Sequence, residues 1–197
     1  GVAASHVGLQ FGSPSILPVN NSGASSDNAV DLGDSNVRFK DLYLSSSAKI
    51  TNSSGNASVE LTSSTSGTSF INMGDTGDAD IGQISYVNNG NSMRFTTNAS
   101  ERIRIDSGGN VGIGNSSPSS FSQNGSQRLV VGSGSGTQGL TVYAGNTSYS
   151  AISFADGTSG TAQYAGFLNY NHNGDHLQIG VGASERMRIT SGGSVNI

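Results

Sequence analysis

Apolar residues occur along this chain in short alternating bursts, and polar residues fill the spaces between them. Alternation with a period of two is typical of β-strands that bury one face. Every stretch that could form a helix is interrupted by Gly or by β-branched residues. The pattern therefore predicts an all-β protein made of short strands and many polar turns.

One phrase of the sequence occurs twice. "ASERIRIDSGGNVGI" occupies 99–113, and "ASERMRITSGGSVNI" occupies 183–197, 84 positions later. In each copy an alternating run is followed by a turn rich in Gly and small polar residues, and then by a second alternating run. The phrase predicts a β-hairpin whose apolar side chains share one face. The apolar residues of the two copies are Ile103, Ile105, Val111 and Ile113, and Met187, Ile189, Val195 and Ile197.

The repeat extends upstream of this phrase. Asn89-Gly90 and Asn173-Gly174 keep the spacing of 84, and an Asn-Gly pair between alternating runs favours a hairpin. Further upstream the spacing falls to 81, as between Ile71 and Ile152, which indicates a three-residue insertion in the second copy. Each copy thus predicts an antiparallel meander of five or six strands.

The domain organisation follows from these units. An N-terminal segment (1–26) precedes a junction module (27–56), in which "RFKDLYL" (38–44) predicts a turn followed by a strand. The first meander repeat covers 57–115, a linker covers 116–127, and the second repeat covers 128–197. We expect "RLVVG" (128–132) to form the first strand of the second repeat.

A single unit of this kind is poorly stabilised as a monomer. Full burial of its four hairpin side chains contributes about 1.5–3 kcal/mol each. Ordering the residues of the phrase costs about 1–2 kcal/mol per residue, which is more in total. Because the apolar face needs a partner, we expect it to pack on the same face of identical chains. The energetic argument predicts self-association and leaves the number of chains open.

The composition narrows the possible functions. The chain contains 36 Ser, 29 Gly and 19 Asn among 197 residues, and its net charge is −4. A small negative charge argues against nucleic acid or an anionic membrane as the partner, and no apolar run is long enough to span a membrane. The absence of Cys excludes disulfides, thiol nucleophiles and zinc–thiolate sites.

The charged residues of the repeated phrase are the first candidate site. They are Glu101, Arg102 and Arg104, and in the second copy Glu185, Arg186 and Arg188. These side chains suit either a clamp for carbohydrate or phosphate, or ion pairs that set the register between strands or neighbouring chains. Their recurrence in both units favours ion pairs, because a unique binding site would not need two copies.

His172 and His176 form a second candidate site, since an H-x3-H pair beside a carboxylate suits a metal ion. Here the pair straddles a predicted turn, and the first unit has Asn88 and Ser92 at the same places. Cross-strand stacking or surface hydrogen bonding is therefore the favoured interpretation. A trimer axis that gathers three copies of His172 is the arrangement in which a metal site could form.

The sequence offers little material for catalysis or for a cofactor. It has three Glu, three His and no Cys, and the Gly-rich stretches 108–114 and 132–136 do not precede a helix. Asp75, Asp78 and Asp80 could bind Ca²⁺ through oxygen, but their spacing favours a solvated loop. We predict no catalytic residue, no cofactor and no resident metal.

The phrases themselves carry a resemblance. "SERIRIDSGGNVGIGNSSP" (100–118) resembles the repeated phrase of bacteriophage tail-fibre and related phage structural proteins. Residues 152–180 are similar to the strand segment that precedes this phrase there, and 27–50 are similar to a third module of such fibres. The resemblance implies an elongated fibrous homotrimer on the outside of a virion, in contact with adjoining tail or fibre proteins.

Three functions are then open. The chain could be a structural segment of a phage tail fibre that supports host attachment. It could instead be a module that binds a host-surface glycan or receptor through the loops 72–82 and 155–164, in a viral or bacterial surface filament. A depolymerase is the third, and it would require paired carboxylates in a groove.

Overall fold

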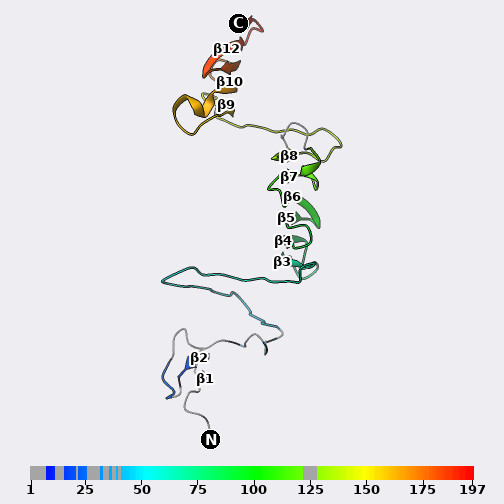
Figure 1. The fold of residues 1–197 in the computed structure, drawn as a ribbon, viewed down its shortest axis with the longest axis vertical. Coiled ribbons are helices and arrows are strands. Elements are labelled where there is room, and N and C mark those ends of the chain that lie inside the picture. Colours follow the sequence, from blue (N-terminus) through cyan, green and yellow to red (C-terminus); the bar gives the residue numbers. More distant parts are fainter. Residues whose placement is uncertain are drawn as a thin grey trace. The chain divides into compact units, whose positions relative to one another are not determined.

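The structure is a computed structural model that describes residues 8–11, 16–20, 22–25, 32, 36, 39, 41–121 and 128–197. The chain divides into two compact units, Gly1–Val59 and Glu60–Ile197. Across the described residues the regular elements are β-strands and two short 3-10 turns, η1 (Pro118–Phe121) and η3 (Gly160–Tyr164) (Figure 1). The prediction of an all-β fold built from hairpins and meanders is confirmed.

The first unit contains one antiparallel hairpin, formed by β1 (Gly8–Phe11) and β2 (Ile16–Val19). The turn after β2 is held by the Asn20 carboxamide oxygen, which accepts hydrogen bonds from the backbone N–H groups of Ser22 and Ala24. Most of the expected junction module before residue 41 lies outside the described residues.

The strand expected at 38–44 is not present over its described part, because 41–44 have no strand assignment. Leu42 and Tyr43 are 70% and 89% exposed. The alternating pattern of this segment was the basis of the prediction. A strand also needs a neighbour to pair with, and local alternation cannot supply one.

The second unit contains two sheets, and the first of them has six strands. They are β3 (Thr68–Met73), β4 (Gly82–Val87), β5 (Ser92–Thr97), β6 (Ser100–Ile105), β7 (Val111–Ile113) and β8 (Leu129–Val131). The strands lie side by side in chain order, as Figure 1 shows. All neighbours are antiparallel except β7 and β8, which are parallel.

Strand β8 corrects one expectation. We predicted that 128–132 would open the second repeat, but β8 instead extends the first sheet by pairing with β7. The N–H of Val111 donates to the carbonyl of Arg128 over 3.0 Å, and the N–H of Gly132 donates to that of Ile113 over 2.9 Å. Without β8, strand β7 would be an open edge with unpaired backbone groups, and β8 satisfies them.

The second sheet has five strands, all antiparallel to their neighbours. They are β9 (Tyr149–Phe154), β10 (Gly166–Asn171), β11 (His176–Val181), β12 (Ser184–Ile189) and β13 (Val195–Asn196). Their order along the sheet is again the chain order. The register between β9 and β10 is the same as the register between β3 and β4. The pairs β10–β11 and β11–β12 likewise correspond to β4–β5 and β5–β6. The sequence repeat is therefore also a structural repeat.

The tight turns of the two sheets also correspond. Strands β5 and β6 are joined through Asn98 and Ala99, with φ of 50° and 51°, and β11 and β12 through Gly182 and Ala183, with φ of 63° and 56°. Positive φ at both central residues is the geometry that matches the twist of a two-residue hairpin. The hairpins expected at the two Asn-Gly pairs are also present, and their turns are four-residue loops, 88–91 and 172–175.

The turn inside the repeated phrase differs in chemistry between the two copies. In the first copy one oxygen of the Asp106 carboxylate accepts from the backbone N–H groups of Gly108 and Asn110, each over 2.9 Å. The Asn110 side chain, which is buried, donates to the same carboxylate. In the second copy the Thr190 hydroxyl accepts only from the N–H of Ser194, over 3.1 Å. The backbone hydrogen bonds of the two turns are the same.

This difference predicts that only the first turn responds to acid. The hydrogen bonds from Asn110, first through its side chain and then through its backbone, lower the pKa of Asp106 below its ordinary value of 3.8. Its contribution to stability is therefore complete above the unfolded-state pKa and is lost as the pH falls through the lower folded-state pKa. We expect the amide resonances of Gly108 and Asn110 to titrate, by NMR, at a pH below the ordinary carboxyl pKa of 3.8.

The Asp106→Thr variant copies the second turn and should abolish this titration. The amides of Gly192 and Ser194 provide the internal control, since no carboxylate holds that turn. A response of equal size in both turns would contradict the assignment to Asp106.

Candidate functional site

The first sheet carries two rows of mainly apolar side chains on one face. The row through its middle crosses all six strands, because each of its members lies directly opposite the next. Its members are Ile71, Ile84, Phe95, Ile103, Ile113 and Val131. The adjacent row is formed by Ser69, Tyr86, Met93, Ile105, Val111 and Leu129.

The second sheet repeats both rows at the corresponding positions. One row contains Ile152, Leu168, Ile179 and Met187. The other contains Ser150, Tyr170, Leu177, Ile189 and Val195. Even the polar residue at the start of the second row has the same role: Ser69 and Ser150 donate to the carbonyls of Leu61 and Val142, over 2.9 and 2.7 Å. We call these two surfaces the apolar faces.

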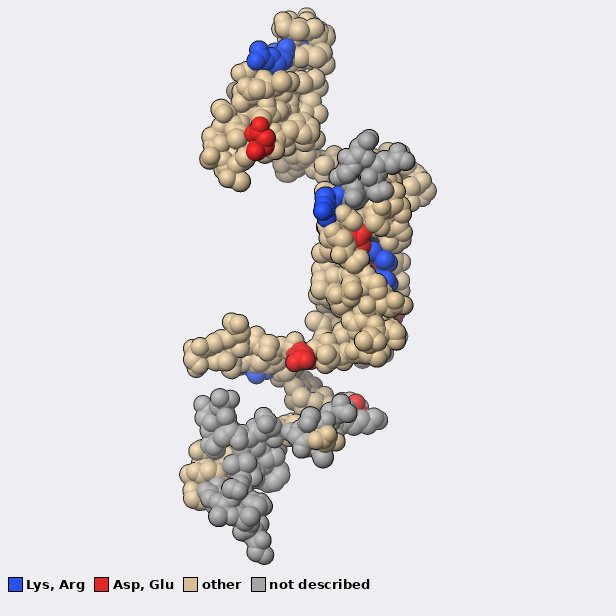
Figure 2. All heavy atoms as spheres, viewed as in Figure 1, with Lys and Arg blue, Asp and Glu red and all other residues tan. Residues whose placement is uncertain are grey.

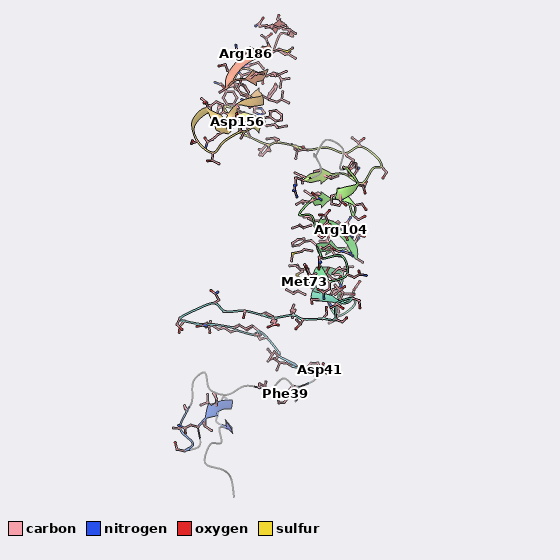
Figure 3. The ribbon with its side chains drawn as sticks, in the orientation of Figure 1. Phe39, Asp41, Met73, Arg104, Asp156 and Arg186 are labelled. Atoms are coloured by element: carbon pink, nitrogen blue, oxygen red, sulfur yellow. The ribbon has the colours of Figure 1, made fainter. Side chains whose placement is uncertain are left out.

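The described part of the chain covers the apolar faces only in part. On the second face, Leu140 and Val142 line a hollow together with Ile152 and Leu168. Among the residues whose side chains the structure describes, none of the row residues is buried, and the one fully buried apolar side chain is Pro118, outside the rows. Ile71 at the start of the first row is 50% exposed, and Ile113 further along it is 42% exposed. Side chains extend to both sides of each stack of strands in Figure 3. Each sheet therefore has a partly exposed apolar surface on one side.

Seven of the eight residues predicted to form the self-association core lie on these faces, and Ile197 does not. Ile103 lies opposite Ile113, and Ile105 lies opposite Val111. In the second copy Ile189 lies opposite Val195, and Met187 continues the row from Ile179. Ile197 follows β13 and is fully exposed. The structure thus brings the predicted hairpin residues together, while their role in association stays a prediction.

Strand β7 alternates apolar residues with glycine, so one side of this strand carries no side chain. The glycines Gly112 and Gly114 permit a close approach by another backbone. A Cβ added at Gly112 would collide with the carbonyl oxygen of Asn115, so the approaching backbone is that of the next few residues.

The opposite face of the first sheet holds a small ion cluster. A bulge shifts the register of β6 at Arg102, since Phe95 lies opposite Ile103 while Thr96 lies opposite Glu101. The extra residue interrupts the alternation and puts Glu101 on the same face as Arg104. Their side chains form two hydrogen bonds of 2.8 and 2.7 Å, and Arg94 on β5 lies 3.5 Å from the same carboxylate. The hydrogen bond that Arg104 donates to Glu101 raises the pKa of Arg104.

The second sheet has the same bulge and a related but weaker cluster. The shift falls at Arg186, because Ile179 lies opposite Met187 and Gly180 lies opposite Glu185. The Glu185 carboxylate accepts two hydrogen bonds of 2.7 Å from Arg188 and a further one from Gln178. The hydrogen bond from Arg188 is the main cause that lowers the pKa of Glu185.

Arg102 and Arg186, at the bulges, have different partners from the other predicted ion-pair residues. Arg102 donates to the Thr97 hydroxyl over 3.1 Å, and Arg186 donates to the carbonyl of Val181 over 3.3 Å. Arg186 on β12 is labelled in Figure 3. Figure 2 shows that charged side chains are few and scattered on the face in view. Ion pairs between neighbouring chains remain a prediction.

The two histidines are held by different neighbours. His172 Nε2 is hydrogen-bonded to the Ser150 hydroxyl over 2.9 Å, and its ring meets that of Tyr170 edge-on at 5.0 Å. His176 begins β11, and its Nε2 is buried without a hydrogen-bond partner. No group of three His, Cys, Asp or Glu side chains suited to a metal was found among the described residues. Stacking and hydrogen bonding account for His172.

The acidic loop before β4 is satisfied by its own backbone. Asp75 accepts from the N–H groups of Gly77 and Asp78, over 2.8 and 3.0 Å, and Asp78 accepts from that of Asp80. The hydrogen bond from Gly77, followed by that from Asp78, lowers the pKa of Asp75. These contacts favour the solvated-loop interpretation over a cation site. Within the described residues, none of the helical turns is long and apolar enough to cross a bilayer.

Sequence reasoning missed a hollow on the polar face of the second sheet. It has a volume of about 400 Å³ and lies over β9, β10 and β11. Its lining includes Tyr149, Tyr164, Phe167, Asn169 and Gln178. A signal for it existed in the aligned repeats, since the first unit has smaller or charged residues at most of these positions.

The ion cluster leads to a prediction that compares the two sheets. Arg94 lies directly opposite Arg104, so Glu101 separates two like charges. We expect Glu101→Gln to destabilise the β5–β6 pair by roughly 1 kcal/mol, because like charges across strands repel. In the second sheet Gln178 lies opposite Arg188, so Glu185→Gln should have a smaller effect. Amide hydrogen exchange of the paired strands measures both changes. Equal effects in the two sheets would argue against charge repulsion as the cause.

Comparisons of the chain with family models, with curated proteins and with solved structures found no match. The function therefore has to be argued from the two sheets themselves and from the resemblance of the repeated phrases.

Proposed function

We propose that this chain is a structural segment of a bacteriophage tail fibre, and that identical chains associate through the apolar faces of their sheets. The segment supports host attachment mechanically, as part of an elongated homotrimer outside the cell, next to adjoining tail or fibre proteins. It is not an enzyme on this proposal. The observation that carries it is the pair of apolar faces that the described part of the chain leaves partly exposed.

The energetics of these faces support association. Each full burial of a large apolar side chain contributes about 1.5–3 kcal/mol, and the row residues are all partly exposed, from Leu129 at 55% to residues such as Ile103 that are half-buried. Covering them by another chain would therefore recover a fraction of that contribution per side chain, over many side chains. Because both sheets present the same pattern, one kind of contact can serve both.

The geometry of the faces suits a partner of the same kind. The rows contain Ile, Leu, Phe, Met and Val, with no charged side chain in either row. The charged side chains of the repeated phrase lie on the opposite face or at the bulges, so they do not oppose close packing of the rows. The number of three chains comes from the resemblance to phage fibre phrases.

A second candidate function is recognition of a glycan on a host surface. The hollow on the second sheet favours it, and it is compatible with the structural function because the hollow lies on the other face from the rows. A depolymerase has less support. Asp75 and Asp78 in the acidic loop are both held by backbone N–H groups.

Two neighbouring residues of β3 allow a matched test. Ile71 lies on the apolar face and is 50% exposed, while Phe70 lies on the opposite face and is 48% exposed. We expect the unaltered chain to sediment as a species of three times 20.0 kDa. Ile71→Asp together with Ile152→Asp places a charge in the contact of each sheet and should give monomers. Light scattering with sedimentation velocity measures the mass.

Phe70→Asp is the control, because it removes an equally exposed apolar side chain from the other face. It should leave the mass unchanged. A monomer of 20.0 kDa for the unaltered chain, or dissociation by the control alone, would overturn the proposal.

A further inference from the structure

The hollow on the second sheet is built from side chains of three strands and one inserted loop. Tyr149 and Ser153 come from β9, Phe167 and Asn169 from β10, and Gln178 from β11. Tyr164 is supplied by η3, which lies in the loop where the second repeat is three residues longer. The volume of about 400 Å³ lies within the range of small-molecule sites.

The polar face of the first sheet carries an ion cluster at the position that corresponds to the hollow. There the ion cluster of Arg94, Glu101 and Arg104 lies across the face, and Ser85 beneath it is buried. In the second sheet Gln178 stands in place of Arg94 and Asn169 in place of Ser85. Gln178 is shorter and uncharged, so the second sheet keeps the Glu185–Arg188 pair but lacks the third charged side chain of the cluster.

One side chain that lines the hollow has an unpaired polar atom. The side-chain oxygen of Asn169 is covered by its surroundings and accepts no hydrogen bond, so the amide has to turn to reach a donor. Burying an acceptor without a donor costs about 1–3 kcal/mol, so such atoms usually face a ligand or an ordered water. The neighbouring Gln178 is oriented by its hydrogen bond to Glu185. The amides thus form a polar edge that a hydroxyl-bearing ligand can satisfy.

Aromatic rings form the rest of the lining. The Phe167 ring lies against Gly180, where an added Cβ would collide with it, so the bare glycine determines where the ring can sit. The Tyr149 hydroxyl accepts from the Asn171 side chain over 2.8 Å, which holds that ring as well. Tyr164 stands at the border from the inserted loop. Fixed aromatic rings next to amides present an apolar surface and hydrogen-bonding groups together.

We propose that this hollow binds one sugar ring of a neutral glycan. The C–H face of a pyranose packs on the aromatic rings, and its hydroxyl groups donate to Asn169 and exchange hydrogen bonds with Gln178. No charged side chain lines the hollow, which favours a neutral sugar over a sialylated or phosphorylated one. The site is independent of self-association, because its residues alternate with those of the apolar rows.

The full chain, labelled with ¹⁵N, tests this by NMR titration with a panel of neutral disaccharides: lactose, maltose, cellobiose, chitobiose and mannobiose. We expect at least one of them to shift the amides of Asn169 and Gln178 in a saturable way. The dissociation constant should be on the order of 1 mM, as for a shallow open site. The amides of Ser85 and Arg94, at the same places in the first sheet, should not shift.

Two variants and a control localise the binding. Asn169→Ser copies the first sheet, and Tyr164→Ala removes a bordering ring. Each should weaken binding by about tenfold, the loss expected for one hydrogen bond or one aromatic contact. Tyr143→Ala removes a ring that is 94% exposed and does not line the hollow, and it should leave binding unchanged.

The proposal is overturned if no sugar of the panel gives a saturable shift, if both sheets shift alike, or if neither variant weakens binding. The mass of each variant separates this result from self-association. Since these residues lie on the face away from the rows, the variants should keep the mass of the unaltered chain.

Discussion

A β-sheet in a single layer has two surfaces, and the side chains on each of them must either be covered or be compatible with water. In this protein the strands of the second unit put large apolar side chains on one surface without burying any of them among the described residues. On the proposed function, the stability of the sheets rests on a contact outside the sheet itself. The registers, the bulges and the repeated turns all serve to keep the two apolar rows in line across the strands. A slip by one residue would move a whole strand's apolar side chains to the other surface.

The bulges show how the polar surface depends on the same constraint. A strand of six residues with strict alternation would put Glu101 and Arg104 on opposite faces. The extra residue at Arg102 brings them together, while Ile103 and Ile105 stay on the apolar face. The identical shift at Arg186 indicates that the bulge belongs to the unit. One inserted residue thus produces both an unbroken apolar row and a neutralised pair of charges.

Much of this fold could be predicted from the sequence, because alternation, turn residues and the repeat are local signals. The hairpin that pairs Ile103 with Ile113 is the best example. Three features could not be predicted. The pairing of β8 with β7 is a contact between distant segments that no local pattern specifies. The bulge at Arg102 leaves the letters "ERIRI" looking like a regular strand. The strand expected at 38–44 had the right pattern, but 41–44 show that pattern alone does not create a pairing partner.

Some features occur in both sheets, and others occur in the second sheet alone. The apolar rows, the bulge and the tight turns occur in both copies, so they are requirements of the architecture. Several differences lie on the polar face: Arg94 is replaced by Gln178, Ser85 by Asn169, and the loop that carries Tyr164 is three residues longer in the second copy. A change that leaves an acceptor unsatisfied has no benefit for the sheet alone. It is reasonable in a unit that stabilises itself through one face and is free to bind through the other.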